Sequence, residues 1–322
     1  MLGMHTTRRS FVKTVSMAMA AATLPLRAAE TRLPIAFSTL ACPQWEWMKI
    51  LEYAVAHGFA AIELRGLQGN LDLPTHPVFA APQIAQTNRE IIAHGLRIAC
   101  VSSSAHMDEF EEGARAQQSA DAKRFIDLAA MLGAPYVRVF GTHPAANPVN
   151  NSTSSAVSSK PPSLDDKTKA QVAANLKELG THAETHGVTV LIESHDNMVT
   201  SPVLSEVLQG ADSAHVALLW DAYHTFAEGG EDPDFTVRQL GKWIRHTHLK
   251  DSVIGKDGAR RYVLTGRGDV PIERQIAALR RIGYPGFFCF EWEKVWHPDL
   301  EDPEIAVGDY ARVVPGYLRK PL

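Results

Sequence analysis

The segment WIRHTHLKD, residues 243–251, starts as an apolar strand and finishes in two histidines, a lysine and an aspartate. Three other apolar segments finish in acids or histidines in the same way: LIESH (191–195), LLWDAYH (218–224) and FCFEWE (288–293). Strands that cross a core and carry ionisable side chains at their carboxyl ends are typical of parallel α/β folds, in which these ends meet at one face. The repeated ending therefore predicts both the class of fold and the position of a functional site.

Around these four segments, the chain alternates apolar runs of strand length with longer stretches of helical periodicity. The predicted strands are 34–38, 60–64, 96–102, 135–140, 188–193, 216–221, 243–249 and 286–291, and the clearest helices are 83–94, 117–132, 167–186 and 272–282. Eight such repeats predict an α/β fold, a single-domain (β/α)₈ TIM barrel over residues 30–322, and this fold usually takes about 250 residues. A doubly wound open sheet is the alternative, although no Gly-x-Gly-x-x-Gly follows the first strand.

The first 29 residues have the layout of an export signal. TTRRSFVK, residues 6–13, is followed by an alanine-rich, uncharged run that ends at Leu26. Paired arginines in this position are typical of twin-arginine (Tat) signal peptides. The run is too short and too weakly apolar to make a good transmembrane span. We therefore expect an exported, periplasmic protein without a stable membrane anchor.

Composition narrows the class of partner. The 322 residues include 32 Lys and Arg against 36 Asp and Glu, a formal net charge of -4, so the chain offers no general positive field for nucleic acid. Its three cysteines do not make a disulfide framework.

Residues 147–163, NPVNNSTSSAVSSKPPS, interrupt the βα repeat and contain almost no large apolar side chain. This segment predicts a loop inserted over the barrel mouth.

Four side chains that commonly bind metals stand at the ends of four predicted strands: Glu193, Asp221, His248 and Glu291. Because barrel strands end at one face, we expect these side chains to converge. Three carboxylates and one imidazole favour a single divalent ion, Mn²⁺, Mg²⁺ or Co²⁺, and tolerate Zn²⁺. Glu293 points the same way along the extended chain, so the choice between Glu291 and Glu293 stays open.

Further polar side chains near strand ends are candidates for substrate binding: His224, His246, Lys250, Glu63, Arg65 and His106. Alternation puts His246 on the same side of its strand as His248 but deeper, so it is expected to support that ligand. Lys250 continues on this side and is placed to stabilise an oxyanion, while Asp251 is expected to cap the next loop. The basic residues after the seventh strand are interpreted as a solvated loop: Lys256, Arg260, Arg261 and Arg267.

Five motifs, in this order along the chain, resemble a known family: IES, WDAYH, HTHLKDS, TGRGDVPI and GYPGFFCFEWE. The family is that of the xylose isomerase-like TIM barrels, the sugar isomerase, epimerase and AP endonuclease family 2 superfamily, and the resemblance covers essentially the whole chain after the signal. It implies that the positions of Glu193, Asp221, His248 and Glu291 hold the metal. It also implies that the histidine three residues after the aspartate, His224, faces the substrate.

The resemblance implies a mechanism of proton transfer next to a carbonyl group. A ketose or keto-sugar would bind the ion, and the ion would stabilise the enediolate formed when a proton leaves the neighbouring carbon. Glu193 and Glu291 would serve as base and acid, giving epimerisation or isomerisation. The alternative outcome is a metal-dependent lyase or hydratase reaction on 3-keto-glycosides, in which the same enolate expels a group.

Two other functions fit this sequence less well. An endonuclease IV-type nuclease shares the fold, but its Asp-x-His pair after the seventh strand has no match in residues 252–263. A non-catalytic sugar-binding barrel would not need ligand candidates at all four positions. We expect a small-molecule carbohydrate as the partner and no nucleic acid. The identity of the sugar and of the metal stays open. The oligomeric state also stays open, and a homo-oligomer is possible.

Overall fold

A closed ring of eight parallel strands forms the centre of this computed structural model, which describes residues 32–144 and 163–322. The barrel strands are β1 (Ile35–Ser38), β2 (Ala61–Leu64), β3 (Arg97–His106), β4 (Tyr136–Phe140), β5 (Thr189–Glu193), β6 (Val216–Asp221), β7 (Ile244–Leu249) and β10 (Phe288–Phe290). The ring closes because β10 pairs in parallel with β1, with Ile35 opposite Phe288. The predicted TIM barrel is therefore confirmed, and the open sheet is excluded.

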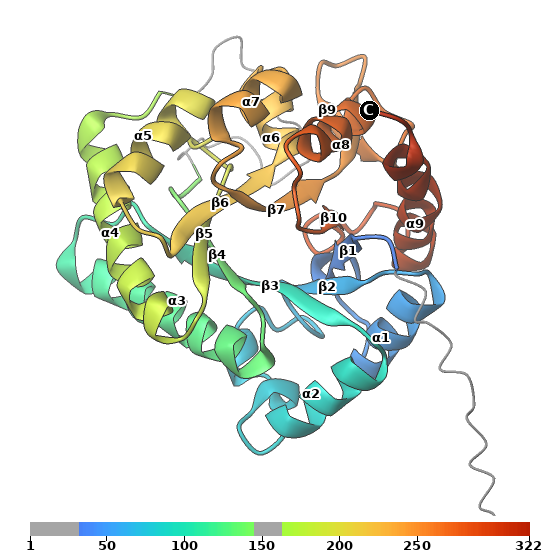
Figure 1. The fold of residues 1–322 in the computed structure, drawn as a ribbon, viewed down its shortest axis with the longest axis horizontal. Coiled ribbons are helices and arrows are strands. Elements are labelled where there is room, and N and C mark those ends of the chain that lie inside the picture. The colour runs from blue at the N-terminus through green and yellow to red at the C-terminus, as the bar shows by residue number, and fades with distance from the viewer. Residues whose placement is uncertain (1–31, 145–162) are drawn as a thin grey trace, which may run out of the picture. The chain divides into compact units, whose positions relative to one another are not determined.

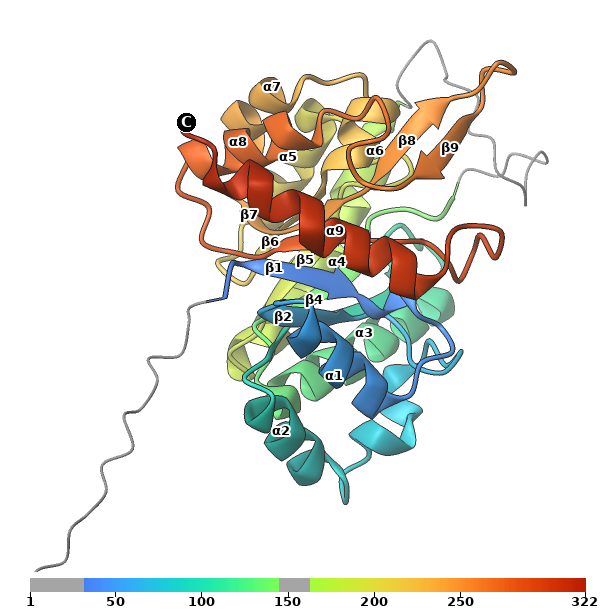
Figure 2. The ribbon, with the colours of Figure 1, turned by 90° about the vertical axis from the view of Figure 1, so that its right-hand side faces the viewer.

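Helices surround the barrel, as Figure 1 shows in a view along its axis and Figure 2 from the side. They are α1 (Trp47–Ala56), α2 (Ile84–Ala93), α3 (Glu112–Leu132), α4 (Asp166–Thr185), α5 (Ser201–Ala211), α6 (Ala222–Ala227), α7 (Pro233–Leu240), α8 (Ile272–Arg281) and α9 (Pro303–Arg319), with short 3₁₀ turns η1 (Thr39–Ala41), η2 (Leu73–Thr75) and η3 (Pro77–Phe79). The four predicted helices correspond to α2, α3, α4 and α8. Helix α3 begins earlier than predicted because the Glu111 side chain caps it, accepting the Ala114 N–H at 2.7 Å.

The main hydrophobic core contacts the outer side of the strands, and small residues occupy part of the barrel interior. Ile35 and Phe37 of β1 belong to this outer core, while Ala36 packs with Ala61, Ala99 and Cys289 in a separate small cluster. Successive side chains of a strand point to opposite sides. The small inward residues leave room for the large polar side chains that the barrel also buries.

The chain after β7 differs from the predicted solvated loop. It folds into an antiparallel hairpin of β8 (Asp251–Ile254) and β9 (Arg260–Val263). The Arg260 guanidinium donates to Ser252 Oγ at 2.8 Å and to Asp269 Oδ1 at 2.6 Å, so this arginine is paired rather than free. The expected capping role of Asp251 is confirmed, because its Oδ2 accepts the N–H groups of Gly266 and Gly268 at 2.8 and 2.9 Å. Arg260 and Arg261 thus lie in β9 rather than in a loop, whereas Lys256 and Arg267 lie outside the strands and are exposed, as predicted.

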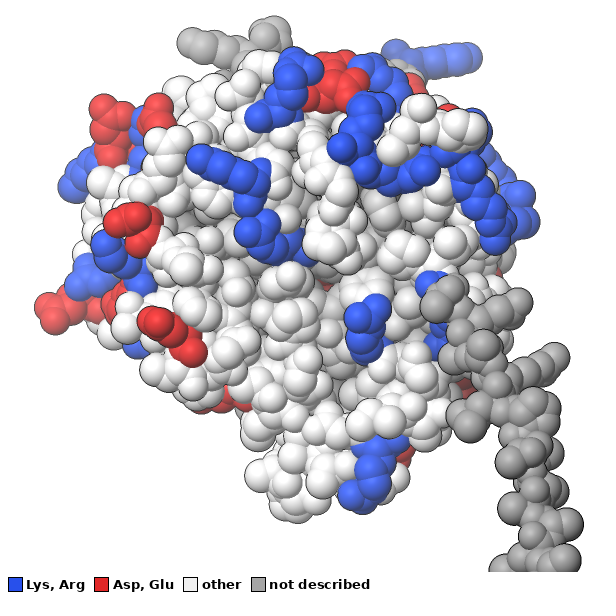
Figure 3. All heavy atoms as spheres, viewed as in Figure 1, with Lys and Arg blue, Asp and Glu red and all other residues white. Residues whose placement is uncertain are grey.

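Charged side chains of both signs are scattered over the largely uncharged face shown in Figure 3, with lysines and arginines most frequent toward α7, α8 and α9. Several of these basic groups are neutralised locally. Arg274 pairs with Asp232 at 2.6 Å, Lys320 pairs with Glu273 at 2.7 Å, and Arg281 pairs with Asp234. Arg274 also lies 3.1 Å from Asp234, so Arg274 and Arg281 share a carboxylate, whereas Lys320 and Glu273 form a separate ion pair.

Some sequence predictions fall on residues outside the described ranges. These are the export signal at residues 1–29 and positions 147–162 of the predicted insertion. Within residues 32–144 and 163–322, no helix has both the length and the apolar character needed to cross a membrane.

The end of α3 gives a test of backbone strain. Gly133 ends the helix at a φ of 65°, and a Cβ added there would contact nothing within 4 Å. We expect Gly133→Ala to lower the free energy of unfolding by about 1–2 kcal/mol, because an L-residue is strained in the left-handed region. Urea titration followed by circular dichroism would measure this change.

The matched control is Gly316 inside α9, where an added Cβ also has open space but the backbone is not left-handed. Gly316→Ala should raise the free energy of unfolding by about 0.5–1 kcal/mol, since alanine favours the helix. Equal effects at the two positions would contradict backbone strain as the cause.

Candidate functional site

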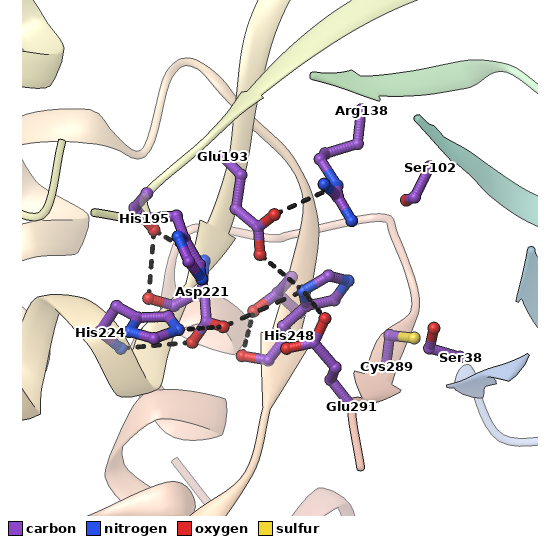
Figure 4. A network of polar contacts seen from close by, with 12 residues as sticks. Ser38, Ser102, Arg138, Glu193, His195, Asp221, His224, His248, Cys289 and Glu291 are labelled. Carbon is purple, nitrogen blue, oxygen red and sulfur yellow. Dashed lines mark hydrogen bonds and ion pairs between the residues drawn. The ribbon is translucent and has the colours of Figure 1, made fainter. Parts of the chain in front are cut away.

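The four predicted metal ligands meet at the carboxyl ends of their strands. One ligand atom from each of Glu193, Asp221, His248 and Glu291 lies within 4.8 Å of the others, and all four residues are buried. His248 Nδ1 is at the centre, 3.0 Å from Glu193 Oε1, 3.2 Å from Glu291 Oε1 and 4.0 Å from Asp221 Oδ2 (Figure 4). Strands β5, β6 and β7 and the residue after β10 thus bring one donor each to one point.

The chemistry of these donors fits a divalent metal ion. Three carboxylates in a buried space repel one another, and a cation between them removes that repulsion. Three oxygens and one imidazole nitrogen suit Mn²⁺, Mg²⁺ or Co²⁺, and Zn²⁺ accepts the same donors. Of the two glutamates after β10, Glu291 belongs to this cluster. Glu293 instead contacts Lys250 Nζ at 2.8 Å and accepts the Tyr262 hydroxyl at 3.0 Å.

Two permanent cations flank the cluster on opposite sides. Lys250 Nζ donates to Asp221 Oδ2 at 2.7 Å and to Glu291 Oε2 at 2.5 Å. Burial opposes the charge of Lys250, but the neighbouring carboxylates raise its pKa well above the usual value. On the other side, Arg138 Nε lies 3.1 Å from Glu193 Oε2. Each proposed acid–base glutamate therefore has its own cationic partner.

The pKa values of the two glutamates are shifted in opposite directions. Burial alone raises the pKa of Glu193, but the charges of Arg138 and His248 outweigh burial and hold it below the usual range. Burial also raises the pKa of Glu291, and here the positive charges of His248 and Lys250 do not fully offset it, because Glu193 and Asp221 add negative charge. Two neighbouring carboxylates with opposite pKa shifts are suited to act as a base and an acid.

Glu63 and His246 lie beneath the metal ligands, deeper in the barrel. Glu63 Oε2 accepts hydrogen bonds from His248 Nε2 at 2.7 Å and from His246 Nε2 at 2.8 Å, and the Glu63 side chain is fully buried. Burial raises the pKa of Glu63, but the two imidazoles bring it well below its usual value. With the His248 N–H turned toward Glu63, His248 Nδ1 faces the ligand cluster. Glu63 thus supports His248, and a contact of Glu63 or His246 with the substrate stays a prediction.

The other predicted substrate contacts lie around the mouth. His224 Nδ1 hydrogen-bonds to Glu228 at 2.8 Å, and its buried Nε2 lies 3.5 Å from Asp221 Oδ2 without a hydrogen-bond partner among the described residues. Arg65 donates from Nη2 to Ser104 Oγ at 3.0 Å, and its buried Nη1 likewise has no partner within the described part of the chain. Burial lowers the pKa of Arg65 to about 9. Arg65 Nη1 offers a donor to a ligand, and His224 Nε2 offers one when the ring is protonated.

His106, the remaining predicted contact, is part of a stack of aromatic rings. Its ring stacks between His143, at a centroid distance of 4.1 Å, and Phe140, at 5.0 Å. Burial, with the charge of His143, lowers the pKa of His106 to about 4, so this imidazole is neutral near pH 7. His106 is thus a half-buried ring held by its two stacking partners.

Two site residues were missing from the sequence prediction. Arg138 stands inside the apolar strand YVRVF, and an arginine in a buried strand was the available signal. His195 follows Glu193 by two positions, and its ring lies against His224 at a centroid distance of 4.4 Å. Burial opposes the charge of His195, but the carboxylate of Asp196 raises its pKa to about 9. His195 therefore adds positive charge beside the cluster.

Comparisons with known proteins agree with the barrel fold. The profile of the family described as "Xylose isomerase-like TIM barrel" matches residues 51–310. Inosose dehydratase of Mesomycoplasma hyopneumoniae is 27% identical over 166 residues, which is 46% of this chain and 53% of that protein. Inosose dehydratase of Bacillus thuringiensis is 26% identical over 151 residues, 41% of this chain and 49% of that protein. The chain thus spans about half the length of these curated relatives.

Solved structures share the fold at low sequence identity. A D-allulose 3-epimerase of Methylomonas sp. has a TM-score of 0.67 and 19% identity, covering 89% of this chain and 98% of that one. The 3-keto-D-glucoside 4-epimerase of E. coli has a TM-score of 0.66 and 17% identity, covering 88% and 98%. The IolI protein, solved with a bound zinc atom, has a TM-score of 0.70 and 17% identity, covering 89% and 98%. These similarities are similarities of fold.

The contact between Glu63 and His248 predicts that a change at Glu63, which is not itself a proposed metal ligand, weakens metal binding. Glu63→Gln replaces one carboxylate, which accepts from both imidazoles, by an amide that orients His248 less firmly. We expect metal affinity to fall by about 10- to 100-fold, the usual effect of losing such a supporting group. Calorimetric titration with Mn²⁺ would measure this change.

Glu293→Gln is the matched control, because Glu293 also lies beside the site, mostly buried, but contacts Lys250 and Tyr262 instead of His248. Its metal affinity should stay within a few-fold of the unmodified protein. An equal loss in both variants would contradict the role assigned to Glu63.

Metal binding should also depend on pH. Burial lowers the pKa of metal-free His248, but the charges of Glu291, Glu63 and Glu193 raise it well above 6.5. Below that pKa the ring carries a proton that an ion must displace, so affinity should fall about tenfold for each unit decrease in pH. Titrations in buffers with different ionisation enthalpies would count the released protons. Affinity that does not change between pH 6 and 8 would contradict this prediction.

Proposed function

This chain belongs to the xylose isomerase-like TIM barrel family, and on that premise we propose that it is a divalent-metal-dependent isomerase or epimerase acting on a ketose or keto-sugar. The observation that supports this most is the pair Glu193 and Glu291. Their carboxylates approach His248 Nδ1 from β5 and from the end of β10, at 3.0 and 3.2 Å, and their pKa values are shifted in opposite directions.

The pair can move a proton at a carbon next to a carbonyl group. A divalent ion held by Glu193, Asp221, His248 and Glu291 would supply Lewis acidity that makes this carbon-bound hydrogen acidic. Glu193, kept ionised by Arg138, accepts the proton as the base. Glu291, whose raised pKa favours the protonated form, returns a proton to the resulting enediolate. Return to the opposite face of the same carbon inverts it, and return to the adjacent carbon gives the isomer.

Neighbouring side chains support these two steps. Lys250 lies 2.5 Å from Glu291 Oε2 and balances the negative charge that remains when Glu291 gives up its proton. The unpartnered donor atoms of His224 and Arg65 are suited to sugar oxygen atoms. All four proposed ligands are buried, so water has little access to the reacting atoms once a substrate covers the mouth.

A second candidate function is dehydration of an inosose or elimination from a 3-keto-glycoside. It is favoured by the similarity to inosose dehydratases and by the position of His224. Burial lowers the pKa of His224, but Glu228 and Asp221 raise it above the usual value. In this reaction Glu193 accepts the proton from carbon, the carbon–oxygen bond at the β-carbon breaks, and His224 donates a proton to the leaving oxygen. The products are water, or an alcohol, and an unsaturated ketone.

The proposal also covers the partner and the location of the enzyme. The partner is a small carbohydrate rather than nucleic acid, as the negative net charge suggests. The enzyme acts after export, a location that rests on the sequence TTRRSFVK near its amino terminus. Detection of the mature protein in the periplasm, starting near residue 30, would test the location.

The proposed reaction predicts that replacing Glu193 and replacing Glu291 have different effects on catalysis. The metal-loaded protein would be incubated in D₂O with ketoses, inososes and 3-keto-glycosides, and NMR would record both deuterium uptake and product. Glu193→Gln should lose exchange by about 10²- to 10⁴-fold, because it lacks the base. Glu291→Gln should keep exchange at one carbon but form little epimer, because it lacks the acid.

Glu304→Gln provides the control, since Glu304 is an exposed residue paired with Lys49 far from the barrel interior. An unsaturated ketone without any epimer would select the second candidate function. Absence of both exchange and elimination across the panel, with each of Mn²⁺, Mg²⁺, Co²⁺ and Zn²⁺, would refute the enolate mechanism.

A further inference from the structure

A second group of metal-binding side chains lies outside the barrel, between the parallel helices α3 and α4. Asp127 belongs to α3, and His182 and His186 stand one turn apart on α4. Their ligand atoms all lie within 4.8 Å of one another. His182 Nε2 is 2.9 Å and His186 Nε2 is 3.3 Å from the same oxygen, Asp127 Oδ1. Two imidazole nitrogens and one carboxylate oxygen therefore point at one small volume.

The hydrogen bonds of His186 show which of its nitrogens is available. His186 Nδ1 lies 3.0 Å from the carbonyl oxygen of His182 and 2.9 Å from Thr185 Oγ1. The Thr185 hydroxyl donates to that same carbonyl at 2.8 Å, so both neighbours act as acceptors toward His186. A neutral His186 ring consequently carries its hydrogen on Nδ1, and Nε2 has the free lone pair.

This assignment leaves an electrostatic conflict at Asp127. The lone pair of His186 Nε2 faces a carboxylate oxygen at 3.3 Å, and two acceptors at this distance repel each other. A cation between them turns the repulsion into attraction. That cation is either a proton on the imidazole or a metal ion bound by both groups.

The preceding turn of the same helix pair provides a comparison. There Lys123 Nζ pairs with Glu178 at 2.8 Å, and Ser119 Oγ donates to Glu178 at 2.9 Å. One turn later, the position four residues after Lys123 is Asp127, and it faces two imidazoles instead of a carboxylate. The turn with Glu178 therefore has a permanent cation, Lys123. The turn with Asp127 has only side chains that can bind a cation.

The three side chains are open to a metal ion from solvent. Their exposed fractions are 28% for His182, 32% for His186 and 48% for Asp127. Water can therefore complete the coordination of a bound ion. A mixed set of imidazole and carboxylate with free positions suits Zn²⁺, which accepts four ligands in a tetrahedral arrangement.

We propose that Asp127, His182 and His186 form a Zn²⁺ site that links α3 to α4 on the outside of the barrel. This site is separate from the cluster around His248 and does not depend on the proposed function. Because the ion contacts both helices only in the folded protein, bound Zn²⁺ stabilises the fold.

The test counts zinc ions on the full-length protein. Wild type, His186→Gln, Asp127→Asn and the control Glu178→Gln would be dialysed against Zn²⁺ at pH 7.5 and analysed by atomic emission. We expect His186→Gln and Asp127→Asn to bind one Zn²⁺ fewer per chain than wild type. Glu178→Gln removes the neighbouring ion pair without touching the site, so it should bind as many ions as wild type.

Asp221→Asn separates this proposal from the barrel site. It should lose the barrel ion and keep the one at α3 and α4, and the double variant Asp221→Asn/His186→Gln should lose both. The Zn²⁺-dependent rise in Tm that remains in Asp221→Asn should disappear in the double variant. Equal zinc content in wild type, His186→Gln and Asp127→Asn would overturn the proposal and leave a proton as the cation at Asp127.

Discussion

The barrel depends on the balance of charge that it buries at the carboxyl ends of its strands. Carboxylates from β5, β6 and the end of β10 converge on the imidazole of His248, and burying them without compensation would cost several kcal/mol for each charge. Arg138 and Lys250 provide part of the compensation, at 3.1 Å from Glu193 and 2.7 Å from Asp221. The negative charge that these two side chains leave uncompensated can be neutralised by a divalent ion.

The same balance extends below the site. Glu63 accepts hydrogen bonds from His246 and His248 in the barrel interior, where water cannot replace either contact. A fully buried carboxylate destabilises a fold unless it is paired, so this network is better understood as a support for His248 than as a source of stability. The large apolar core outside the strands offsets its cost.

The β8–β9 hairpin closes one side of the same charge network. Tyr262 of β9 donates to Glu293, and Glu293 in turn contacts Lys250. Lys250 therefore has fixed partners on both sides, since it also donates to Asp221 and Glu291. A lysine held in this way keeps its ammonium group in one position, which the proposed acid–base pair next to it requires.

The sequence by itself determined the barrel, its eight strands and the four side chains that converge at their ends. These features follow from local patterns, since apolar periodicity marks strands and helices, and strand alternation fixes which side chains point inward. Only the tertiary structure decided which further side chains meet these four. Glu63 and His248 are separated by 185 positions, and no local pattern predicts their contact. The place of Glu291 rather than Glu293 in the cluster, and the approach of Asp127 to two histidines of the next helix, also depend on packing, because residues distant in sequence become neighbours only when the helices and strands are assembled.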